Sequence, residues 1–337
     1  MTTLIDTLQA REMIAAVTHD TLDSHLEETT VTAYAGFDPT ADSLHLGHLL
    51  PIMMLAHMQQ RGHHPILLVG GATGMIGDPS GRSDERNLLD ADQVMHNVSC
   101  IRAQLERFIS FAGDNPARIM NNHDWIGRIS FVDWLRDIGK NFNVNQMLAK
   151  ESVRARINTE QGISYTEFSY MTLQAYDFAH LCREQGCTLQ VGGSDQWGNI
   201  TAGIDLGRKL VGTQLYGMTC PLVTTSSGEK FGKSAGNAVW LSAERTSPYK
   251  FYQYWINTED ADLGRFLKLF TFLPLTEIEQ IVADHQAEPH RRRGQQRLAE
   301  EMTRLVHGVD ALAAAQQATA VLFGGDVDGL GDAELEQ

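Results

Sequence analysis

The stretch that decides the fold is VTAYAGFDPTADSLHLGH, residues 31–48. Its first part, VTAYAGF (31–37), is β-prone, and the Asp-Pro that follows is a turn signal. A helical pattern then runs from about residue 44 to residue 60, and PILLVGG (65–71) reads as a second buried strand. Strand, helix and strand in this order favour a parallel sheet covered by helices on both faces.

The same succession recurs further along the chain. TEFSYMTLQAYDFAHLCREQG (166–186) has helical apolar spacing and stops at Gly186, and TLQVGGS (188–194) follows as a short buried strand. We therefore expect an α/β fold with a Rossmann-like, parallel-sheet nucleotide-binding domain. In such sheets ligands bind beyond the carboxyl ends of the strands, where the glycine-rich loops fall.

Beyond about residue 247 the pattern is helical alone. The last helical stretch, DALAAAQQATAVLF, ends at Gly324-Gly325, which is a helix-stop signal. We expect a catalytic domain over residues 1–220, a linker over 221–246 and a mainly helical domain over 247–337.

The composition is that of a globular protein: 337 residues, 42% hydrophobic and 20% charged. No leader pattern or apolar run of ~20 residues is present, so we expect a cytoplasmic protein with no membrane segment. Its four cysteines form no C-x-x-C pair, which favours reduced thiols over a zinc site. The formal net charge of −15 argues by itself against nucleic-acid binding, which needs basic residues.

Two histidines of the opening stretch are candidates for chemistry. His45 and His48 are three residues apart and are expected on one helix face, near the positive end of the helix dipole. That combination suits a triphosphate, and Gly47 would let a nucleotide approach the backbone closely. Two ordinary histidines on an amphipathic helix remain the alternative for this motif alone.

A second motif, KFGKS (230–234), lies in a Gly- and Ser-containing loop. Lys230 and Lys233 would close over a pyrophosphate leaving group, although a solvated basic loop has the same composition. Taken in this order, the two motifs resemble the signature motifs of class I aminoacyl-tRNA synthetases. Phe231 replaces the methionine usual at the centre of the second motif, a variation that the tyrosine enzymes accept.

Four segments together resemble the bacterial tyrosyl-tRNA synthetases, and the similarity is near-continuous from about residue 34 to residue 268. They are GFDPTADSLHLGH (36–48), GGATGMIGDPSG (70–81), YMTLQAYD (170–177) and QVGGSDQWGN (190–199). Spacing adds an independent indication, because Tyr170, Gln174 and Asp177 share one helix face. A core helix does not normally carry three polar groups there.

The resemblance implies roles for individual residues. Tyr34 and Asp177 would hold the phenol hydroxyl of tyrosine, Tyr170, Gln174 and Asp78 its ammonium, and Gln196 its carboxylate. Phosphate stabilisation during adenylate formation would fall to His45, His48, Lys230 and Lys233, with Thr40 beside them. The remaining ATP contacts would be Gly36, Asp38, Gly47, Gly193, Asp195, Lys233 and Ser234.

The implied reaction has two steps. Tyrosine attacks the ATP α-phosphate to give tyrosyl adenylate, and the terminal ribose of tRNA(Tyr) then takes the tyrosyl group. Mg²⁺ would arrive with ATP, and we expect no protein-bound metal or organic cofactor. The resemblance also implies a homodimer, with a candidate interface at about residues 125–160 that includes Phe131, Trp134, Phe142 and Met147.

Three other functions fit parts of the pattern. A tryptophanyl-tRNA synthetase shares the fold and both motifs, but an indole offers no hydroxyl to Tyr34 and Asp177. A small-molecule nucleotidyltransferase fits the lysine loop and helical domain less well. An inactive RNA-binding relative conflicts with the intact motif residues.

The acidic charge is explained by the end of the chain. Members of the family usually carry a further C-terminal RNA-binding module, and nothing resembling it precedes Gln337, so we expect a fragment or a natural short form. The run Arg291 to Arg293 with Arg297 is either a tRNA contact or a solvated helix end.

Overall fold

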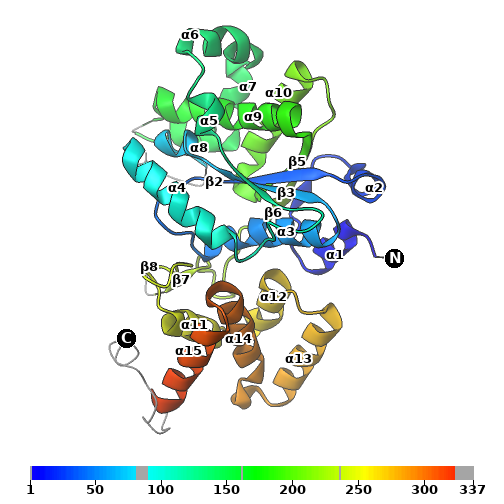
Figure 1. Cartoon of the computed structure of the whole chain (residues 1–337), viewed down its shortest axis with the longest axis vertical. Helices are drawn as coiled ribbons and strands as arrows, with labels where there is room; N and C mark the ends of the chain where they lie inside the picture. Colours follow the sequence, from blue (N-terminus) through cyan, green and yellow to red (C-terminus); the bar gives the residue numbers. More distant parts are fainter. Residues whose placement is uncertain (1, 81–89, 161, 235–236, 323–337) are drawn as a thin grey trace. The chain divides into compact units, whose positions relative to one another are not determined.

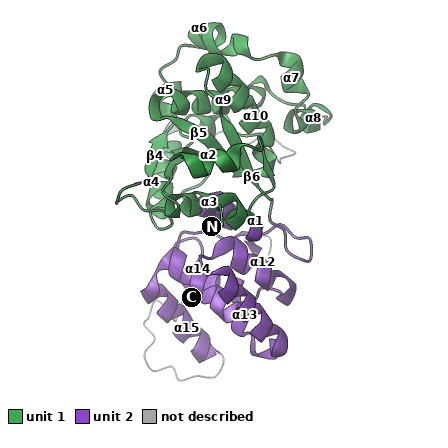
Figure 2. Cartoon of the chain, turned by 90° about the vertical axis from the view of Figure 1, so that its right-hand side faces the viewer, with its two compact units in different colours: residues 1–9, 13–42, 54–222 green, residues 10–12, 43–53, 223–337 purple. Residues whose placement is uncertain are grey.

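The computed structural model describes residues 2–80, 90–160, 162–234 and 237–322. The chain divides into two compact units (Figure 2): residues 1–9, 13–42 and 54–222 form the first, and residues 10–12, 43–53 and 223–337 the second. The histidine motif therefore groups with the lysine motif in the second unit, although sequence order places it in the predicted catalytic domain. The units group residues that lie close together in the folded chain, whatever their order in the sequence.

The first unit is built on a six-stranded sheet, ordered β1-β6-β5-β2-β3-β4. Only β1 and β6 pair antiparallel; the other neighbours are parallel. The strands are β1 (Ala16–Val17), β2 (Thr32–Phe37), β3 (His64–Val69), β4 (Arg118–Asn121), β5 (Cys187–Gly193) and β6 (Tyr216–Cys220). The predicted α/β fold with a parallel sheet is confirmed.

The order of the strands creates a switch point between β2 and β5. The chain steps from β2 outward to β3 and β4, then returns to place β5 on the other side of β2. Tyr34 of β2 and Gln190 of β5 are register partners across this point. Ligands of open α/β sheets bind beyond the carboxyl ends of the strands at such a place.

Helices cover the two faces of the sheet, with α9 and α10 on one side and α3 on the other (Figure 1). The helices of the first unit are α1 (Leu4–Ala10), α2 (Leu22–Glu28), α3 (Leu49–Gln60), α4 (Ala91–Leu105), α5 (His123–Ile126), α6 (Phe131–Asp133), α7 (Val144–Leu148), α8 (Glu151–Ile157), α9 (Tyr165–Gln185) and α10 (Trp197–Leu210). The division between the units falls within α3. Single 3-10 turns are η2 (Thr73–Met75), η4 (Gly139–Asn141) and η5 (Ser194–Gln196), and η3 (Trp134–Ile138) is a short π-helix.

Local signals set the ends of α9. The Ser164 side chain accepts a hydrogen bond from the Glu167 backbone N–H at 3.2 Å, which caps the first turn. Gly186 ends the helix at φ 63°, a left-handed conformation that glycine adopts without steric cost. The helix predicted over 166–186 is thus confirmed to within one residue at each end.

The second unit is mainly helical. Its elements are η1 (Leu46–His48), the two-stranded β7 (Lys233–Ser234) and β8 (Asn237–Ala238), then α11 (Pro248–Ile256), α12 (Asp260–Phe270), α13 (Leu275–Ala287), η6 (Pro289–Arg291), α14 (Arg293–His307) and α15 (Val309–Leu322). Helix α14 packs against α11, α12, α13 and α15. The predicted stop at Gly324-Gly325 lies outside the described residues. Among the helices that are described, none combines the length and apolar character needed to span a membrane.

Candidate active site

The carboxyl ends of four parallel strands carry the residues of the candidate site in the first unit. Asp38 follows β2, Gly70 follows β3 and Asn122 comes directly after β4. Strand β5 ends at Gly193 and is followed at once by the turn that holds Asp195. Parallel strands end at the same edge of a sheet, so segments distant in sequence meet there.

Asp177 lies at the buried centre of this site, with 1% of its surface exposed. Asn122 Nδ2 donates to one carboxylate oxygen at 3.0 Å and Trp125 Nε1 donates to the other at 2.8 Å. Burial raises the pKa of Asp177 to about 7, although both hydrogen bonds act in the opposite direction. The fold therefore holds a carboxyl group in a fixed orientation inside an apolar core.

Tyr34 is fully buried, and its hydroxyl has no hydrogen-bond partner within the described part of the chain. Burial and the nearby Asp177 charge raise the pKa of Tyr34 well above its ordinary value. The side-chain oxygen of Gln190, on the neighbouring strand, is likewise buried without a partner among the described residues. Buried polar groups are normally paired, so a ligand with its own polar group is expected here.

Polar groups at the end of β5 are linked to α9. Asn199 Nδ2 donates to Gln174 Oε1 at 3.0 Å and to Gln196 Oε1 at 3.1 Å. Gln196 Nε2 in turn donates to Asp78 Oδ2 at 2.7 Å. The structure thus brings together Gln174, Asp78 and Gln196, which the sequence placed around the amino-acid backbone.

Tyr170 has a different partner. Its hydroxyl donates to Asp38 Oδ2 at 2.8 Å, which joins α9 to the end of β2. Of the other predicted ATP residues in this unit, Gly36 and Thr40 are exposed. A Cβ on Gly193 would lie 2.4 Å from Asp195 Oδ1, so glycine is what lets that carboxylate fold back over the strand end.

The segment GGATG after β3 is held by the end of β4. Asn121 Oδ1 accepts from the Gly71 N–H at 3.1 Å, and Asn122 Oδ1 accepts from the Ala72 N–H at 2.8 Å. A Cβ on Gly71 would lie 2.2 Å from Asn121 Oδ1, so only glycine fits. This contact explains Gly71, since a side chain of the next strand occupies the space.

The histidine motif forms a tight turn in the second unit. His45 Nδ1 accepts from the Gly47 N–H and His48 Nδ1 accepts from the His45 N–H, each at 3.1 Å. The ring centroids are 3.9 Å apart. His45 is the cap of η1 and His48 its last residue, so His45 precedes the helix in which it was expected. A Cβ on Gly47 would lie 2.9 Å from His45 Cε1, so the close approach observed at Gly47 is that of the His45 ring.

The lysine motif surrounds a buried aromatic anchor. Phe231 stacks on Phe270 with centroids 4.7 Å apart, and the Gly232 N–H donates to the Tyr254 hydroxyl at 3.0 Å. Lys230 and Lys233 on either side are exposed. The middle of the motif is therefore fixed to the helical unit, while both ammonium groups face solvent. The side chain of Ser234 lies outside the described residues.

The two motifs meet through backbone pairing. The Leu46 N–H donates to the Val239 carbonyl at 3.0 Å, and the Leu241 N–H donates to the Leu44 carbonyl at 2.8 Å. The Val239 N–H also donates to the Gly232 carbonyl at 2.8 Å. The segment after the lysine hairpin thus joins it to the histidine turn, 180 residues or more away in sequence.

The arginine cluster is largely engaged by its own unit. Arg291 pairs with Glu288 at 3.0 Å, and Arg297 pairs with Glu277 at 3.0 Å. Arg292 Nη2 donates to the Ile256 carbonyl at 2.7 Å. These contacts favour the solvated helix end over a dedicated tRNA surface.

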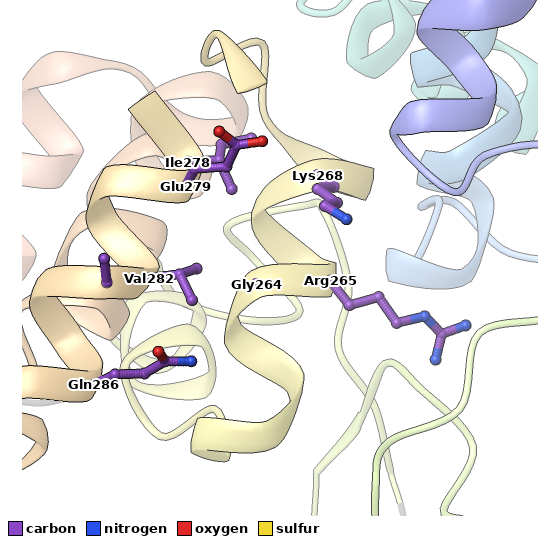
Figure 3. A pocket seen from close by; sticks show the side chains of 8 residues that line it. Gly264, Arg265, Lys268, Ile278, Glu279, Val282 and Gln286 are labelled. Atoms are coloured by element: carbon purple, nitrogen blue, oxygen red, sulfur yellow. The ribbon is translucent and has the colours of Figure 1, made fainter. Parts of the chain in front are cut away.

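A pocket of about 360 Å³ lies between α12 and α13 (Figure 3) and contains none of the predicted site residues. Its two cations already have partners, since Lys268 pairs with Glu12 at 2.8 Å and Arg265 Nη1 donates to the Thr224 carbonyl at 3.2 Å. The predicted chemistry therefore does not lie in this pocket. The lining is Gly264, Arg265, Lys268, Ile278, Glu279, Val282, Ala283 and Gln286.

Sequence reasoning missed Asn122, Trp125, Gln190 and Asn199. Gln190 and Asn199 lie inside the quoted QVGGSDQWGN segment, where a glutamine within a buried strand was an available signal. Asn122 and Trp125 follow a four-residue strand that no pattern had indicated.

Residues 26–324 match the family described as tRNA synthetases class I (W and Y). The fold and this match define the chain as a class I tRNA synthetase. The tyrosine–tRNA ligase of Roseiflexus castenholzii is 55% identical over 98% of this chain and 78% of its own length. That of Bacillus subtilis, ligase 1, is 54% identical over 97% and 78%. The chain belongs to the tyrosine–tRNA ligase family.

Solved structures agree with the fold. A C-terminally truncated mitochondrial tyrosyl-tRNA synthetase of Aspergillus nidulans superposes with a TM-score of 0.87 at 32% identity, covering 96% of this chain and 95% of that one. A tryptophanyl-tRNA synthetase of Encephalitozoon cuniculi reaches 0.65 at 12% identity, over 98% and 89%. The second likeness is one of fold alone.

Proposed function

We propose that this protein activates L-tyrosine with ATP to tyrosyl adenylate and then transfers the tyrosyl group to the 3′-terminal ribose of tRNA(Tyr). The observation that carries the proposal is the buried pair of Tyr34 and Asp177 at the switch point of the sheet. The phenol hydroxyl of tyrosine donates to Asp177 and exchanges a hydrogen bond with Tyr34. Both buried groups are then satisfied.

Rejection of phenylalanine follows from the same pair. A phenyl ring would fill the space but leave the buried polar groups of the pocket without a partner, at a cost of about 1–3 kcal/mol for each group. Tryptophan presents an N–H at a different position on a larger ring. The relatives at 54–55% identity are tyrosine–tRNA ligases, which favours tyrosine over the tryptophan alternative.

The amino-acid backbone of the substrate binds next to the phenol pocket. Its ammonium group is held by Asp78, Gln174 and Tyr170, which supply a carboxylate and two neutral oxygens. Gln196 lies within hydrogen-bond distance of Asp78 and binds the carboxylate end. The nucleotide is contacted by residues at the ends of β2 and β5, namely Gly36, Asp38, Thr40, Gly193 and Asp195.

The phosphates are stabilised by the histidine and lysine motifs. His45 and His48 donate hydrogen bonds, and Lys230 and Lys233 neutralise the charge that grows on the leaving pyrophosphate. No side-chain nucleophile is needed, because the substrate carboxylate attacks directly, so positioning and electrostatics carry the rate. Mg²⁺ arrives with ATP, and the reaction takes place in the cytoplasm, where tRNA is charged.

The active protein is a homodimer through the segment expected from the sequence, about residues 125–160, extended to Tyr165. Seven large hydrophobic side chains of this segment are exposed: Phe131, Val132, Leu135, Val144, Leu148, Ile157 and Tyr165. An apolar group of this size on a water-facing surface supports a protein partner. Met147, by contrast, is buried in the core of its own chain, and Trp134 and Phe142 pack against that core.

The test is ATP–pyrophosphate exchange with tyrosine, phenylalanine and tryptophan in separate reactions. Exchange with tyrosine alone is expected, and it requires no tRNA. Folded protein that exchanges with none of the three would overturn the proposal, and exchange with tryptophan would reassign the pocket.

A further inference from the structure

Two carboxylates of the first unit are joined by a continuous hydrogen-bond relay, which we define as Asp177–Asn122–Thr73–Asp38. Asn122 Nδ2 donates to Asp177 Oδ2 at 3.0 Å and to Thr73 Oγ1 at 3.0 Å. Thr73 Oγ1 then donates to Asp38 Oδ1 at 2.7 Å. The relay runs from Asp177, the carboxyl group proposed to bind the phenol hydroxyl, to Asp38, the carboxylate that accepts a hydrogen bond from the Tyr170 hydroxyl.

The direction of every proton in the relay is fixed by donor capacity. Asn122 uses one amide N–H on each neighbour, and its oxygen accepts from the Ala72 N–H at 2.8 Å. Thr73 has a single hydroxyl proton, and since it accepts from Asn122 it gives that proton to Asp38. Asp38 also receives the Tyr170 hydroxyl on its other oxygen, so both of its oxygens are engaged.

Burial makes the relay energetically consequential. Asn122, Thr73 and Asp177 are each 3% exposed or less. In such surroundings a lost hydrogen bond is not replaced by water, and chains of hydrogen bonds polarise one another. A displacement of one residue of the relay therefore changes the hydrogen bond made by the next.

Gly70 provides the space in which the relay closes. A Cβ at this position would lie 2.2 Å from Asp38 Oδ1 and 2.3 Å from Thr73 Oγ1. The bond between Thr73 and Asp38 passes directly over the backbone at the end of β3. A side chain at residue 70 would separate the two groups.

We propose that Thr73 is a positioning residue that couples recognition of the phenol hydroxyl at Asp177 to placement of the substrate ammonium by Tyr170. The inference rests on the proposed function, because it assigns those roles to Asp177 and Tyr170. Thr73 itself touches Asp38 and Asn122, and it acts through them. Tyrosine and phenylalanine then differ in how their reacting ends are placed as well as in how their rings bind.

The decisive variant is Thr73→Val, which keeps the volume and removes the hydroxyl. It leaves Asn122 without an acceptor for one N–H and Asp38 without one donor. We expect kcat/KM for tyrosine in pyrophosphate exchange to fall about 10- to 100-fold, the range that an unpaired buried group implies. The kcat/KM for phenylalanine should fall less, so that the tyrosine-to-phenylalanine ratio of kcat/KM decreases. Thr73→Ser keeps the hydroxyl and should restore most of the ratio.

Thr219→Val is the matched control. Thr219 is a buried threonine of the same sheet, 1% exposed, and its hydroxyl makes one long bond of 3.4 Å to the Ala16 carbonyl. A loss caused by general loosening of the sheet would appear in this variant as well, and it would lower kcat/KM equally for both amino acids. We expect its tyrosine-to-phenylalanine ratio to match that of the unaltered protein.

A second measurement tests the coupling itself. If Thr73 and Tyr170 act through one relay, the ratio in the double variant Thr73→Val/Tyr170→Phe should be no lower than in the worse single variant. An unchanged ratio in Thr73→Val, an equal loss in Thr73→Ser, or fully additive losses would overturn the relay while leaving tyrosine-dependent exchange intact. Absence of exchange in the unaltered protein would instead remove the proposed function.

Discussion

Burial raises the pKa of Asp177 to about 7 from an ordinary value of 3.8, and this links the stability of the protein to pH. The folded state binds the Asp177 proton more tightly than the unfolded chain does. The stabilisation from this proton is therefore complete below about pH 4 and is lost as the pH rises to about 7.

Asp177→Asn should remove that contribution. We expect the difference in urea midpoint between the unaltered protein and the variant to change between pH 4 and pH 7 and to stay constant above pH 7.5. Parallel midpoint curves across the whole range would show that Asp177 does not titrate there.

At the scale of elements, Phe231 connects the lysine hairpin to the aromatic core of the second unit. Phe231→Ala would leave a cavity against Phe270, and we expect a loss of about 3–5 kcal/mol in the free energy of unfolding. Phe231→Met, the more volume-conserving change, should cost less than about 1.5 kcal/mol. Urea denaturation measures both. Lys230→Ala is the control, because this exposed side chain should change exchange activity and leave stability as it was.

Helix α9 begins beside a buried ion pair. Arg156 of α8 contacts both carboxylate oxygens of Glu167 at 2.8 Å, and their side chains are 2% and 1% exposed. Glu167→Gln leaves the guanidinium buried without its counter-charge, and we expect a loss of about 3–5 kcal/mol. Thermal and urea unfolding would measure it.

The exposed pair of Arg136 and Asp137 is the control for that prediction. Asp137→Asn should leave the unfolding midpoint unchanged, because solvent-exposed pairs contribute little. Equal losses in the Glu167 and Asp137 variants would contradict the role of burial.

For the whole molecule, the exposed hydrophobic side chains of residues 131–165 predict the oligomeric state. Val132→Asp places a charge on a side chain that is 68% exposed, and we expect it to convert a dimer to a monomer in sedimentation equilibrium. Val309→Asp, at 65% exposure on α15, is the matched control and should leave the dimer intact. A Val132 variant that sediments as the unaltered protein does would locate the interface elsewhere.

The sequence predicted the elements whose pattern is local. Strand β2 and helix α9 were found to within one or two residues because their apolar periodicity and end signals are contained in the elements themselves. The linker expected over 221–246 contains the paired strands β7 and β8. Each strand has two residues, which is too short for a sequence pattern to predict.

The site was accessible from the sequence only in part. Tyr34 and Asp177 were named from the resemblance, but Asn122 and Trp125, which orient Asp177, come from the segment after β4, 52 and more residues away. His45 was expected inside a helix, whereas its own side chain caps the turn before one. Side-chain caps and contacts between loops depend on tertiary placement, which periodicity does not encode.

The turn at His45 and His48 has a consequence for the chemistry of the two rings. In each ring Nδ1 accepts a backbone N–H, so it carries no hydrogen, and the neutral imidazole must be the Nε2–H tautomer. Each ring can therefore act as a hydrogen-bond donor while uncharged. A second proton, on Nδ1 of either ring, would have to displace the backbone donor. The backbone of the motif selects the tautomer.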